Sequence, residues 1–370
     1  MSGTSLDGVD AVLADASDRV LAAHHESYSA DLRQELLALN RSGADELHRA
    51  ALAGNELARL YARATAQLLQ QAELSIKIGA SDITVLGAHG QTVRHQPGAF
   101  DGTGYTCQLL NGALLAELSG IDVVCDFRSR DVAAGGQGAP LVPAFHQARF
   151  AQTGLNVAVL NLGGMANLSL LPTTGTVTGF DCGPGNVLID QWCQLKRGLP
   201  FDAGGAWASQ GKVQDQLLVQ ALADPFYALP PPKSTGRDLF DDTWVQRWLA
   251  ASDDANFTDA DVAATLTELT AQTVTLALRQ HMQQVQRVVV CGGGAYNTLL
   301  LERLGVLISA LAGPFVQVHS SARVGIAPEQ VEALAFAWLA RAFLDREPGN
   351  LPAVTGARGM RVLGALYPAG

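Results

Sequence analysis

Basic residues are scarce in this sequence of 370 residues. It holds 25 Lys and Arg against 35 Asp and Glu, which gives a formal net charge of -10 at pH 7. Binding to nucleic acid without regard to its sequence requires a basic surface that displaces counterions from phosphates. We therefore expect no nucleic-acid partner, and a negatively charged substrate would need local basic sites.

Cysteine pairs and long apolar runs are also lacking. The five cysteines form no CxxC pair and lie mostly in apolar segments, so we expect buried, reduced thiols in place of disulfides or a zinc site. No apolar stretch approaches the roughly 20 residues that cross a bilayer, and no signal peptide follows Met1. These absences predict a soluble, cytoplasmic protein without a membrane partner.

Apolar residues and glycine, in contrast, are plentiful. Hydrophobic residues make up 48% of a chain that is too long for one ordinary core, which predicts two domains. A β-hairpin pattern at residues 9–20 precedes alternating helical and strand patterns, and a similar succession restarts at residue 157. We predict an α/β protein with domains 1–150 and 151–370, duplicated in architecture rather than in sequence.

Glycine-bearing loops occupy corresponding points of the two halves. They are residues 3–10 (GTSLDGVD) and residues 161–167 (NLGGMAN). Amides, hydroxyls and carboxylates in such turns can hold phosphate oxygens and a hydrated magnesium ion. For the first loop alone, an ordinary turn rich in Ser, Asp and Gly is the alternative. Because the loops are paired, we predict that a nucleotide is held in a central cleft by one loop from each domain, as in actin-like ATPases.

A third loop, residues 292–294, joins a strand pattern to a helical pattern. It lacks the GxGxxG spacing of dinucleotide-binding turns, and no P-loop motif occurs anywhere in the chain. We expect this loop on the adenosine side of the nucleotide. The predicted nucleotide-binding residues are thus Gly3, Thr4, Ser5, Leu6, Asp7, Gly8, Val9 and Asp10, then Gly163, Gly164 and Asn167, and finally Gly292, Gly293, Gly294 and Asn297.

Three polar segments between apolar strands are candidates for chemistry. Asp181 stands at a strand end before two glycines and Pro184, which suits a general base or a carboxylate linked to magnesium, although an Asx turn is the alternative. Residues 88–95 and 126–131 concentrate His, Gln and Arg side chains, which can bind sugar hydroxyls and pair with a carboxylate. For any one of these residues, a structural histidine or an Arg–Asp ion pair remains the alternative.

The ordered motifs resemble the anhydro-N-acetylmuramic acid kinase family. They are residues 3–10, HGQTVRH at 89–95, DFRSRDVAAGGQGAPLVP at 126–143, NLGGMAN at 161–167, FDCGPGN at 180–186, KSTGR at 233–237 and NLPAVTGA at 350–357. The resemblance covers nearly the whole chain in order. It implies the two-domain actin-like ATPase fold of sugar kinases and a role in bacterial cell-wall recycling.

The family resemblance also implies roles for single residues. ATP and Mg²⁺ would be used to open a 1,6-anhydro amino sugar with water and to phosphorylate its O6. Asp181 would activate the water, and Glu332 would help to position sugar and water. His89 with Arg128 or Arg130 would hold the sugar, and Asp7 would bind Mg²⁺ through water. A homodimer is also implied.

One departure from the family concerns the first strand, because members carry a short apolar strand before the segment that starts here at Met1.

The sequence also leaves two alternatives to the kinase open. One is a nucleotide-dependent sugar-binding module of the same fold that has lost catalysis. The other is a kinase for a free sugar, in which Asp181 would deprotonate a hydroxyl rather than water.

Overall fold

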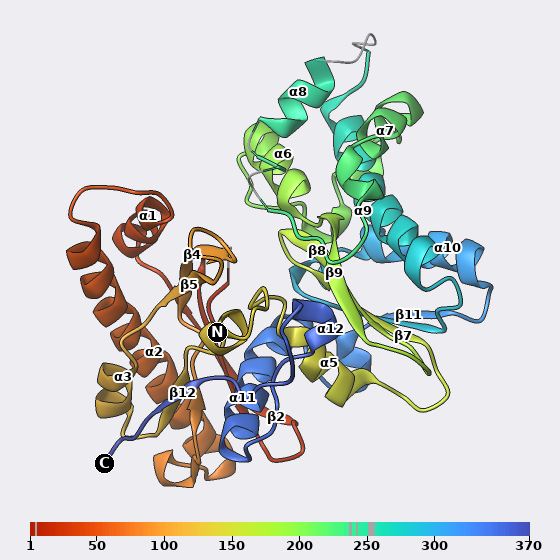
Figure 1. Ribbon diagram of the computed structural model, residues 1–370. Coiled ribbons are helices and arrows are strands. Elements are labelled where there is room, and N and C mark those ends of the chain that lie inside the picture. Colours follow the sequence, from red (N-terminus) through yellow and green to blue (C-terminus); the bar gives the residue numbers. More distant parts are fainter. Residues whose placement is uncertain (4–5, 237–238, 242, 251–255) are drawn as a thin grey trace. The chain divides into compact units, whose positions relative to one another are not determined.

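The computed structural model describes residues 1–3, 6–236, 239–241, 243–250 and 256–370 (Figure 1). The chain forms two compact units, one of Met1–Arg149 with Gln330–Gly370 and one of Phe150–Glu329. The sequence pattern places residues 330–370 in the second domain, but in the structure they belong to the first unit. The reason is that their helix and strand contact β-strands of that unit, as described below.

The first unit opens with the β-hairpin β1 (Gly8–Ala14) and β2 (Val20–Ser27), followed by α1 (Ala30–Leu39) and the long α2 (Glu46–Ile76). The buried residues of α2 recur at spacings of three and four, as in Leu57, Tyr61, Ala64 and Leu68. That spacing places them on one helical stripe, which lies against β1 and β2. The predicted hairpin is present, with its second strand somewhat later in the chain than expected.

A second sheet of this unit has the order β12-β6-β3. Its strands are β3 (Leu86–Gly87), β6 (Val123–Cys125) and β12 (Ala365–Tyr367). α11 (Val331–Leu344) contacts β3 and β1, and β12 pairs antiparallel with β6, so the C-terminal segment completes the first unit. Of the strand predicted at residues 83–87, only the last two residues are paired.

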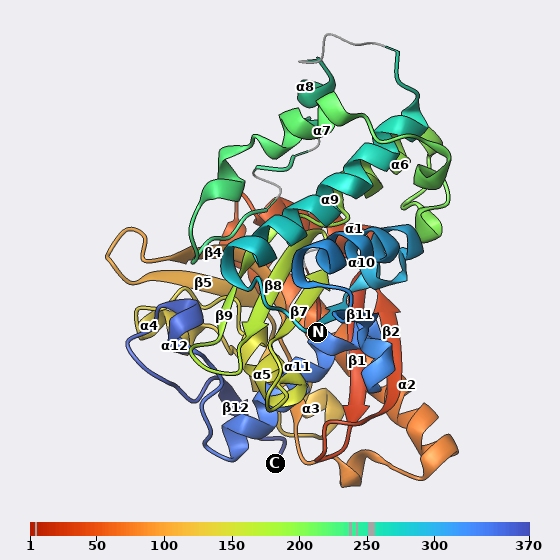
Figure 2. The same cartoon turned by 90° about the vertical axis from the view of Figure 1, so that its right-hand side faces the viewer.

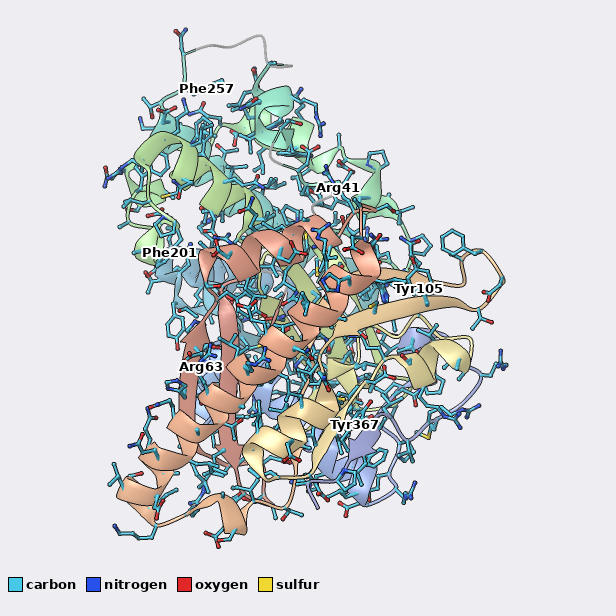
Figure 3. All side chains as sticks on the ribbon, turned by 90° about the vertical axis from the view of Figure 1, so that its left-hand side faces the viewer. Arg41, Arg63, Tyr105, Phe201, Phe257 and Tyr367 are labelled. Carbon is cyan, nitrogen blue, oxygen red and sulfur yellow. The ribbon has the colours of Figure 1, made fainter. Side chains whose placement is uncertain are left out.

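The remaining elements of this unit are the hairpin β4 (Gln91–Pro97) and β5 (Gly104–Leu109), and the helices α3 (Gly112–Ser119), α4 (Ser129–Ala133), α5 (Val142–Phe150) and α12 (Pro352–Thr355). α5 ends at the first residue of the second unit. Figure 3 shows Tyr105 on the β4–β5 hairpin, where its ring stacks on Phe100, and Arg63 on α2.

The second unit is built on one mixed sheet of order β11-β10-β7-β8-β9 (Figure 2). Its strands are β7 (Val157–Leu162), β8 (Met165–Leu171), β9 (Thr178–Pro184), β10 (Arg287–Cys291) and β11 (Gln317–Ser320). β7, β10 and β11 are parallel, while β8 and β9 run antiparallel to their neighbours. The helices α9 (Asp259–His281) and α10 (Thr298–Ala312) bury one face of this sheet in a common core.

A further aromatic core joins α9 to the helices α6 (Val187–Arg197), α7 (Asp215–Leu222) and α8 (Trp244–Ala250). α9 begins with a capping box, in which Thr258 and Asp261 satisfy each other's backbone amides.

Among the described residues, no helix is long and apolar enough to cross a membrane. Both units combine a β-hairpin with later helices and strands, as predicted for an α/β protein.

Candidate functional site

A row of polar residues crosses the sheet of the second unit. Asn161 on β7 lies opposite Asn167 on β8, and Asn167 lies opposite Asp181 on β9. Directly opposed residues project from the same face of a sheet, with Cβ atoms about 5 Å apart. Their neighbours along the strands, such as Leu168 and Phe180, point into the core beneath α9 and α10. Alternation along the strands therefore separates an apolar face from a polar one.

Asp181 lies in the middle of β9, not at a strand end as predicted, and is held by a segment that passes beside this strand. The amide of Thr235 donates to Asp181 Oδ2 at 2.9 Å, and the amide of Asp181 donates to the carbonyl of Lys233 at 3.1 Å. Burial raises the pKa of Asp181 to about 6, against the opposing effects of the Thr235 amide and the Lys233 charge. The carboxyl group thus belongs to a strand and is bound by a distant segment, which differs from the Asx turn considered above.

Lys233 anchors that segment. Its Nζ donates to the carbonyls of Phe226 at 3.1 Å and Tyr227 at 3.3 Å, and lies 4.7 Å from the centre of the Phe226 ring. Burial lowers the pKa of Lys233 below its usual value. Its ammonium group therefore donates to backbone carbonyls and interacts through its charge with Asp181. Sequence reasoning assigned no role to Lys233 or Thr235, although both stand in the KSTGR motif.

The glycine triplet after β10 combines two packed positions with one open position. Gly292 has φ 78°, and a Cβ there would collide with Asn161 Oδ1, while a Cβ at Gly294 would lie 2.6 Å from the Cβ of Leu162. A Cβ at Gly293 would meet nothing within 4 Å. Two of the three glycines thus let β10 approach the end of β7, and the third exposes backbone to open space. Asn297, also predicted to bind nucleotide, caps α10 by accepting from the Leu300 amide at 3.1 Å.

We expect Gly292→Ala to lower the melting temperature of the second unit by about 5 °C or more, because alanine would be strained at this φ and would collide with Asn161. Gly293→Ala is the matched control, and its melting temperature should stay within about 1 °C of the parent. Differential scanning calorimetry measures both. Equal melting temperatures of the two variants would contradict the packing role of Gly292.

The loop between β7 and β8 lies on the start of α6. The carbonyl of Gly164 accepts from the amides of Gly185 and Val187 at 2.8 and 3.1 Å, and that of Gly163 accepts from the Asn186 amide at 2.9 Å. A Cβ at Gly164 would meet nothing within 4 Å. The loop therefore has a fixed backbone with one side open, which suits the close approach of a ligand.

In the first unit, the predicted nucleotide-binding loop at residues 3–10 contains both buried and exposed residues. Thr4 and Ser5 lie outside the described residues, and Gly3 is half-buried. The side chains of Leu6 and Val9 are buried in the core, so only their backbone could reach a nucleotide. Asp7 is exposed, while a Cβ at Gly8 would collide with the carbonyl of Glu26 on β2.

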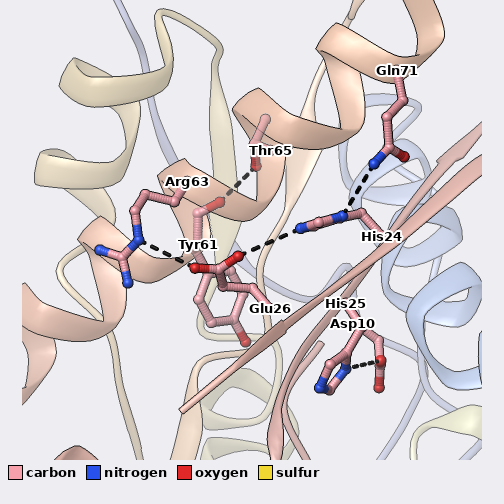
Figure 4. Close-up of polar contacts among 8 residues, drawn as sticks. All are labelled: Asp10, His24, His25, Glu26, Tyr61, Arg63, Thr65 and Gln71. Atoms are coloured by element: carbon pink, nitrogen blue, oxygen red, sulfur yellow. Dashed lines mark hydrogen bonds and ion pairs between the residues drawn. The ribbon is translucent and has the colours of Figure 1, made fainter. Parts of the chain in front are cut away.

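Asp10 is engaged within the hairpin itself. Its Oδ1 lies 2.8 Å from Nδ1 of His25 on β2 (Figure 4). The same close-up shows Glu26 between Arg63 and His24, at 3.3 and 3.4 Å. These contacts tie β2 to α2 and to β1, so the carboxylate of Asp10 takes part in the hairpin's own hydrogen bonding.

The first unit brings together His89 and Arg128. Arg128 Nε donates to His89 Nε2 at 3.0 Å, and Arg128 donates through Nη1 to the carbonyl of Gly138 at 2.8 Å. Because His89 Nε2 accepts, its Nδ1 carries the proton and donates to the carbonyl of Ser2 at 3.2 Å. Burial and the charge of Arg128 hold the pKa of His89 well below its usual range. His89 is therefore a neutral ring.

Glu332 is close enough to Arg128 to act on its charge. Burial lowers the pKa of Arg128 to about 10, and the carboxylates of Glu332 and Asp131 oppose this shift. Glu332 lies in the first turn of α11. Arg130, in contrast, is exposed on α4. Of the two arginines that the sequence could not separate, Arg128 is thus the one beside both His89 and Glu332.

Comparison with known proteins identifies the family. The profile of the family described as "Anhydro-N-acetylmuramic acid kinase" matches residues 1–369. The chain belongs to this kinase family. An anhydro-N-acetylmuramic acid kinase of Variovorax paradoxus (strain S110) is 57% identical over 377 residues, which cover 100% of this chain and 98% of the relative. A second, from Cupriavidus metallidurans, is 51% identical over 374 residues, covering 100% and 96%.

Among solved structures, the activator of the 2-hydroxyisocaproyl-CoA dehydratase from Clostridium difficile with bound ADPNP is similar over 90% of each chain, with a TM-score of 0.42 and 13% sequence identity. Membership in the anhydro-N-acetylmuramic acid kinase family implies the use of ATP. It agrees with the family resemblance carried by the ordered motifs.

Two of the ordered sequence motifs meet at a buried carboxylate, Asp131. It is fully buried and accepts from the Gly138 amide at 2.8 Å, from Asn350 Nδ2 at 2.6 Å and from Thr355 Oγ1 at 2.8 Å. The GGQGAP and NLPAVTGA segments are therefore bound to each other through one side chain. The two motifs do not predict this link, since nothing local to Asp131 indicates a partner more than 200 positions away.

Proposed function

We propose that this protein uses ATP to open the 1,6-anhydro ring of 1,6-anhydro-N-acetylmuramic acid and to phosphorylate its O6, giving N-acetylmuramic acid 6-phosphate and ADP in cell-wall recycling. The observation that carries the proposal is the family match over residues 1–369. A partly buried carboxyl group, Asp181, supplies the chemical group that this reaction needs. Water would attack the anomeric carbon, and O6 would leave it and attack the γ-phosphorus.

In this proposal Asp181 is the general base that removes a proton from the attacking water. A general base works best when its pKa lies near the working pH, and burial raises the pKa of Asp181 to about 6. The Thr235 amide orients the carboxylate through Oδ2. In this proposal Oδ1 accepts the proton of the water molecule. Glu332 would help to position the sugar and the water.

The sugar would be held by the pair of His89 and Arg128. A guanidinium group presents donors in a planar fork that matches a carboxylate, and muramic acid carries one. The neutral His89 ring fixes the plane of the Arg128 guanidinium by accepting from Nε at 3.0 Å. This arrangement favours Arg128 over the exposed Arg130 as the sugar-binding residue.

We expect Arg128→Lys to raise the KM for the sugar about tenfold or more while leaving the KM for ATP unchanged, because a lysine cannot reproduce the planar fork. Arg130→Lys is the matched control and should leave both constants unchanged. Steady-state kinetics with each substrate varied in turn measures the effect. If Arg130→Lys alone raised the KM for the sugar, the assignment would pass to Arg130.

ATP would be bound by backbone at residues 3–10, Gly163 and Gly164, and the loop at Gly293. Open space beside Gly164 and Gly293 fits the close approach of phosphate or adenosine. Asp7 would hold Mg²⁺ through water, and an exposed carboxylate fits this role, because Mg²⁺ keeps several waters and needs one or two carboxylates besides phosphate oxygens. When bound, Mg²⁺ supplies charge neutralisation at the phosphates.

The activity is tested by incubating the protein with ATP, Mg²⁺ and either the 1,6-anhydro or the reducing amino sugar in ¹⁸O-labelled water. The proposal predicts turnover of the anhydro sugar, with the label on the anomeric hydroxyl and none in the phosphate. Phosphorylation of the reducing sugar alone would favour a kinase for free sugars. Absence of any turnover, with ATP still bound, would favour a binding module.

We also propose that the protein is a homodimer and that it acts in the cytoplasm. It rests on the family resemblance. Analytical ultracentrifugation of the purified chain tests the dimer, and a single species at the mass of one chain would contradict it.

A further inference from the structure

Three residues stay partly exposed in the middle of the buried sheet of the second unit. Asn161 is half-buried, whereas the rest of β7 is buried. Asn167 on β8 and Asp181 on β9 are half-buried as well, and their neighbours on both sides along each strand are buried. The three residues lie opposite one another, and Figure 2 shows β8 between β7 and β9. A ligand can therefore reach the sheet at this row.

Asn167 differs from nearby asparagines, because its carboxamide forms no hydrogen bond within the described residues. Asn186 donates through Nδ2 to the Leu162 carbonyl at 3.0 Å, and Asn297 accepts from the Leu300 amide at 3.1 Å. A carboxamide offers two donors and an acceptor oxygen, and leaving them half-buried costs free energy unless water or a ligand binds them. The side chain of Asn167 is thus available to a molecule outside the chain.

The strand opposite Asn167 contains a bulge. Ala166 pairs with Gly183, but Asn167, the next residue along β8, pairs with Asp181. Cys182 is therefore an extra residue of β9. Bulges bend a strand locally and change the direction of a side chain, and they are common next to active sites. The irregular register places the carboxyl group of Asp181, rather than a backbone turn, across from Asn167.

Distances separate two possible roles for Asn167, which the sequence pattern places among the nucleotide-binding residues. Residues advance about 3.3 Å along a strand, so Asn167 lies about 10 Å from Gly164 in the proposed phosphate loop. The Cβ atoms of opposed residues are about 5 Å apart, so Asp181 is much nearer. A short asparagine side chain therefore reaches a molecule bound at Asp181 before one held at the loop.

We propose that Asn167 binds the attacking water together with Asp181, and so acts on the sugar side of the reaction rather than on the nucleotide. This inference rests on the proposed function, which supplies the attack by water. The water donates one hydrogen to Asp181 and the other to Asn167 Oδ1, which leaves a lone pair directed at the anomeric carbon. Two fixed hydrogen bonds hold the water in one orientation.

The reaction then runs in a balanced order. The water oxygen forms a bond to the anomeric carbon, and the bond from that carbon to O6 breaks. Asp181 takes one proton of the water, while Asn167 Oδ1 accepts from the remaining hydroxyl and stabilises the positive charge that develops on its oxygen. O6 keeps the electron pair of the broken bond and attacks the γ-phosphorus, and ADP leaves.

Asn167→Ala should lower kcat about a hundredfold, because the water loses one of its two hydrogen bonds. The ATP dissociation constant, measured by calorimetry, should change by less than about threefold. Because the Asn167 side chain forms no internal bond, the melting temperature should stay within about 2 °C of the parent. Gln194→Ala, on an exposed position of α6, is the control and should keep full activity.

Asn167→Asp tests whether position 167 faces Asp181. A second carboxylate about 5 Å away disfavours ionisation of the pair, so the acid limb of kcat/KM should move up by about one pH unit or more. Titration of the Asp181 carboxyl carbon by ¹³C NMR should show the same shift without any substrate. Gln194→Glu adds the same charge on α6 and should leave the acid limb and the titration unchanged.

The other titratable groups around Asp181 are the same in the parent and in this variant. They are Lys233 on the bound segment, the thiol of Cys182, whose pKa burial raises, and His281 on α9, whose pKa burial and the charge of Lys233 lower. A shift in the titration of Asp181 therefore reports the charge added at position 167.

A kcat of Asn167→Ala equal to that of an active parent would overturn this inference alone. An ATP dissociation constant raised tenfold or more, with an unmoved titration of Asp181 in Asn167→Asp, would also overturn it and would assign Asn167 to the nucleotide. If the parent protein failed to turn over the anhydro sugar, the proposed function itself would fall, and the binding of an attacking water by Asn167 with it.

Discussion

Asp181→Asn is expected to lower kcat by about a thousandfold, because the proposed general base is replaced by an amide that cannot accept a proton. The change keeps the shape of the side chain and an oxygen for the Thr235 amide, so ATP binding measured by calorimetry should change by less than about threefold. Asp215→Asn, on the exposed side of α7, is the matched control and should keep full activity. A nearly active Asp181→Asn variant would remove this residue from the role of base.

The pH dependence provides a second readout of the same residue. With the pKa of Asp181 at about 6, kcat/KM should fall tenfold for each unit of pH below that value, and the residual activity of Asp181→Asn should lack this decline. A pH–rate profile between pH 4.5 and 8, with pH values chosen about half a unit apart, measures it. A profile that is flat down to pH 5 would contradict the assignment.

Stability should move in the opposite direction from activity. Because the folded state raises the pKa of Asp181 above its value of 3.8 in the unfolded chain, the folded state binds this proton more tightly. The free energy of unfolding therefore falls as the pH rises from about 4 to about 6. At pH 7.5 the parent protein must bury an ionised carboxylate at position 181, which lowers its free energy of unfolding. A neutral asparagine avoids this cost, so Asp181→Asn should melt no lower than the parent protein. A lower melting temperature would mean that lost activity reflects unfolding.

Asp131→Ala should lower the stability of the first unit by about 3 kcal/mol or more, because it leaves the Gly138 amide, the Asn350 amide group and the Thr355 hydroxyl without their buried acceptor. For a unit of this size we expect the melting temperature to fall by about 10 °C. Scanning calorimetry should show the loss in one transition, since the second unit holds none of these groups.

Asp101→Ala is the control for that prediction. Asp101 also accepts from two backbone amides, those of Thr103 and Gly104, at 2.9 and 2.8 Å, but it stands in an exposed turn. Water can replace the lost acceptor there, so the melting temperature should change by no more than about 2 °C. Equal losses for the two variants would show that burial of Asp131 adds nothing.

Local patterns predicted the elements that depend on neighbouring residues. The hairpin near residue 9, the helices between residues 31 and 74 and the strand at residue 157 follow from alternation and helical spacing, and all are present. The assignment of residues 330–370 depended instead on contacts with distant strands. Sequence spacing carries no record of which sheet a late helix will cover, and here α11 and β12 contact the first unit.

By itself, the sequence determined the family, the α/β class and the candidate residues, because the order of motifs and the types of residues are properties of the sequence alone. Only the tertiary structure decided which candidates are neighbours. It brought Arg128 to His89, Asn167 to Asp181, and the late Asn350 and Thr355 to Asp131. These pairings depend on strand register and helix packing, which act between residues far apart in the chain.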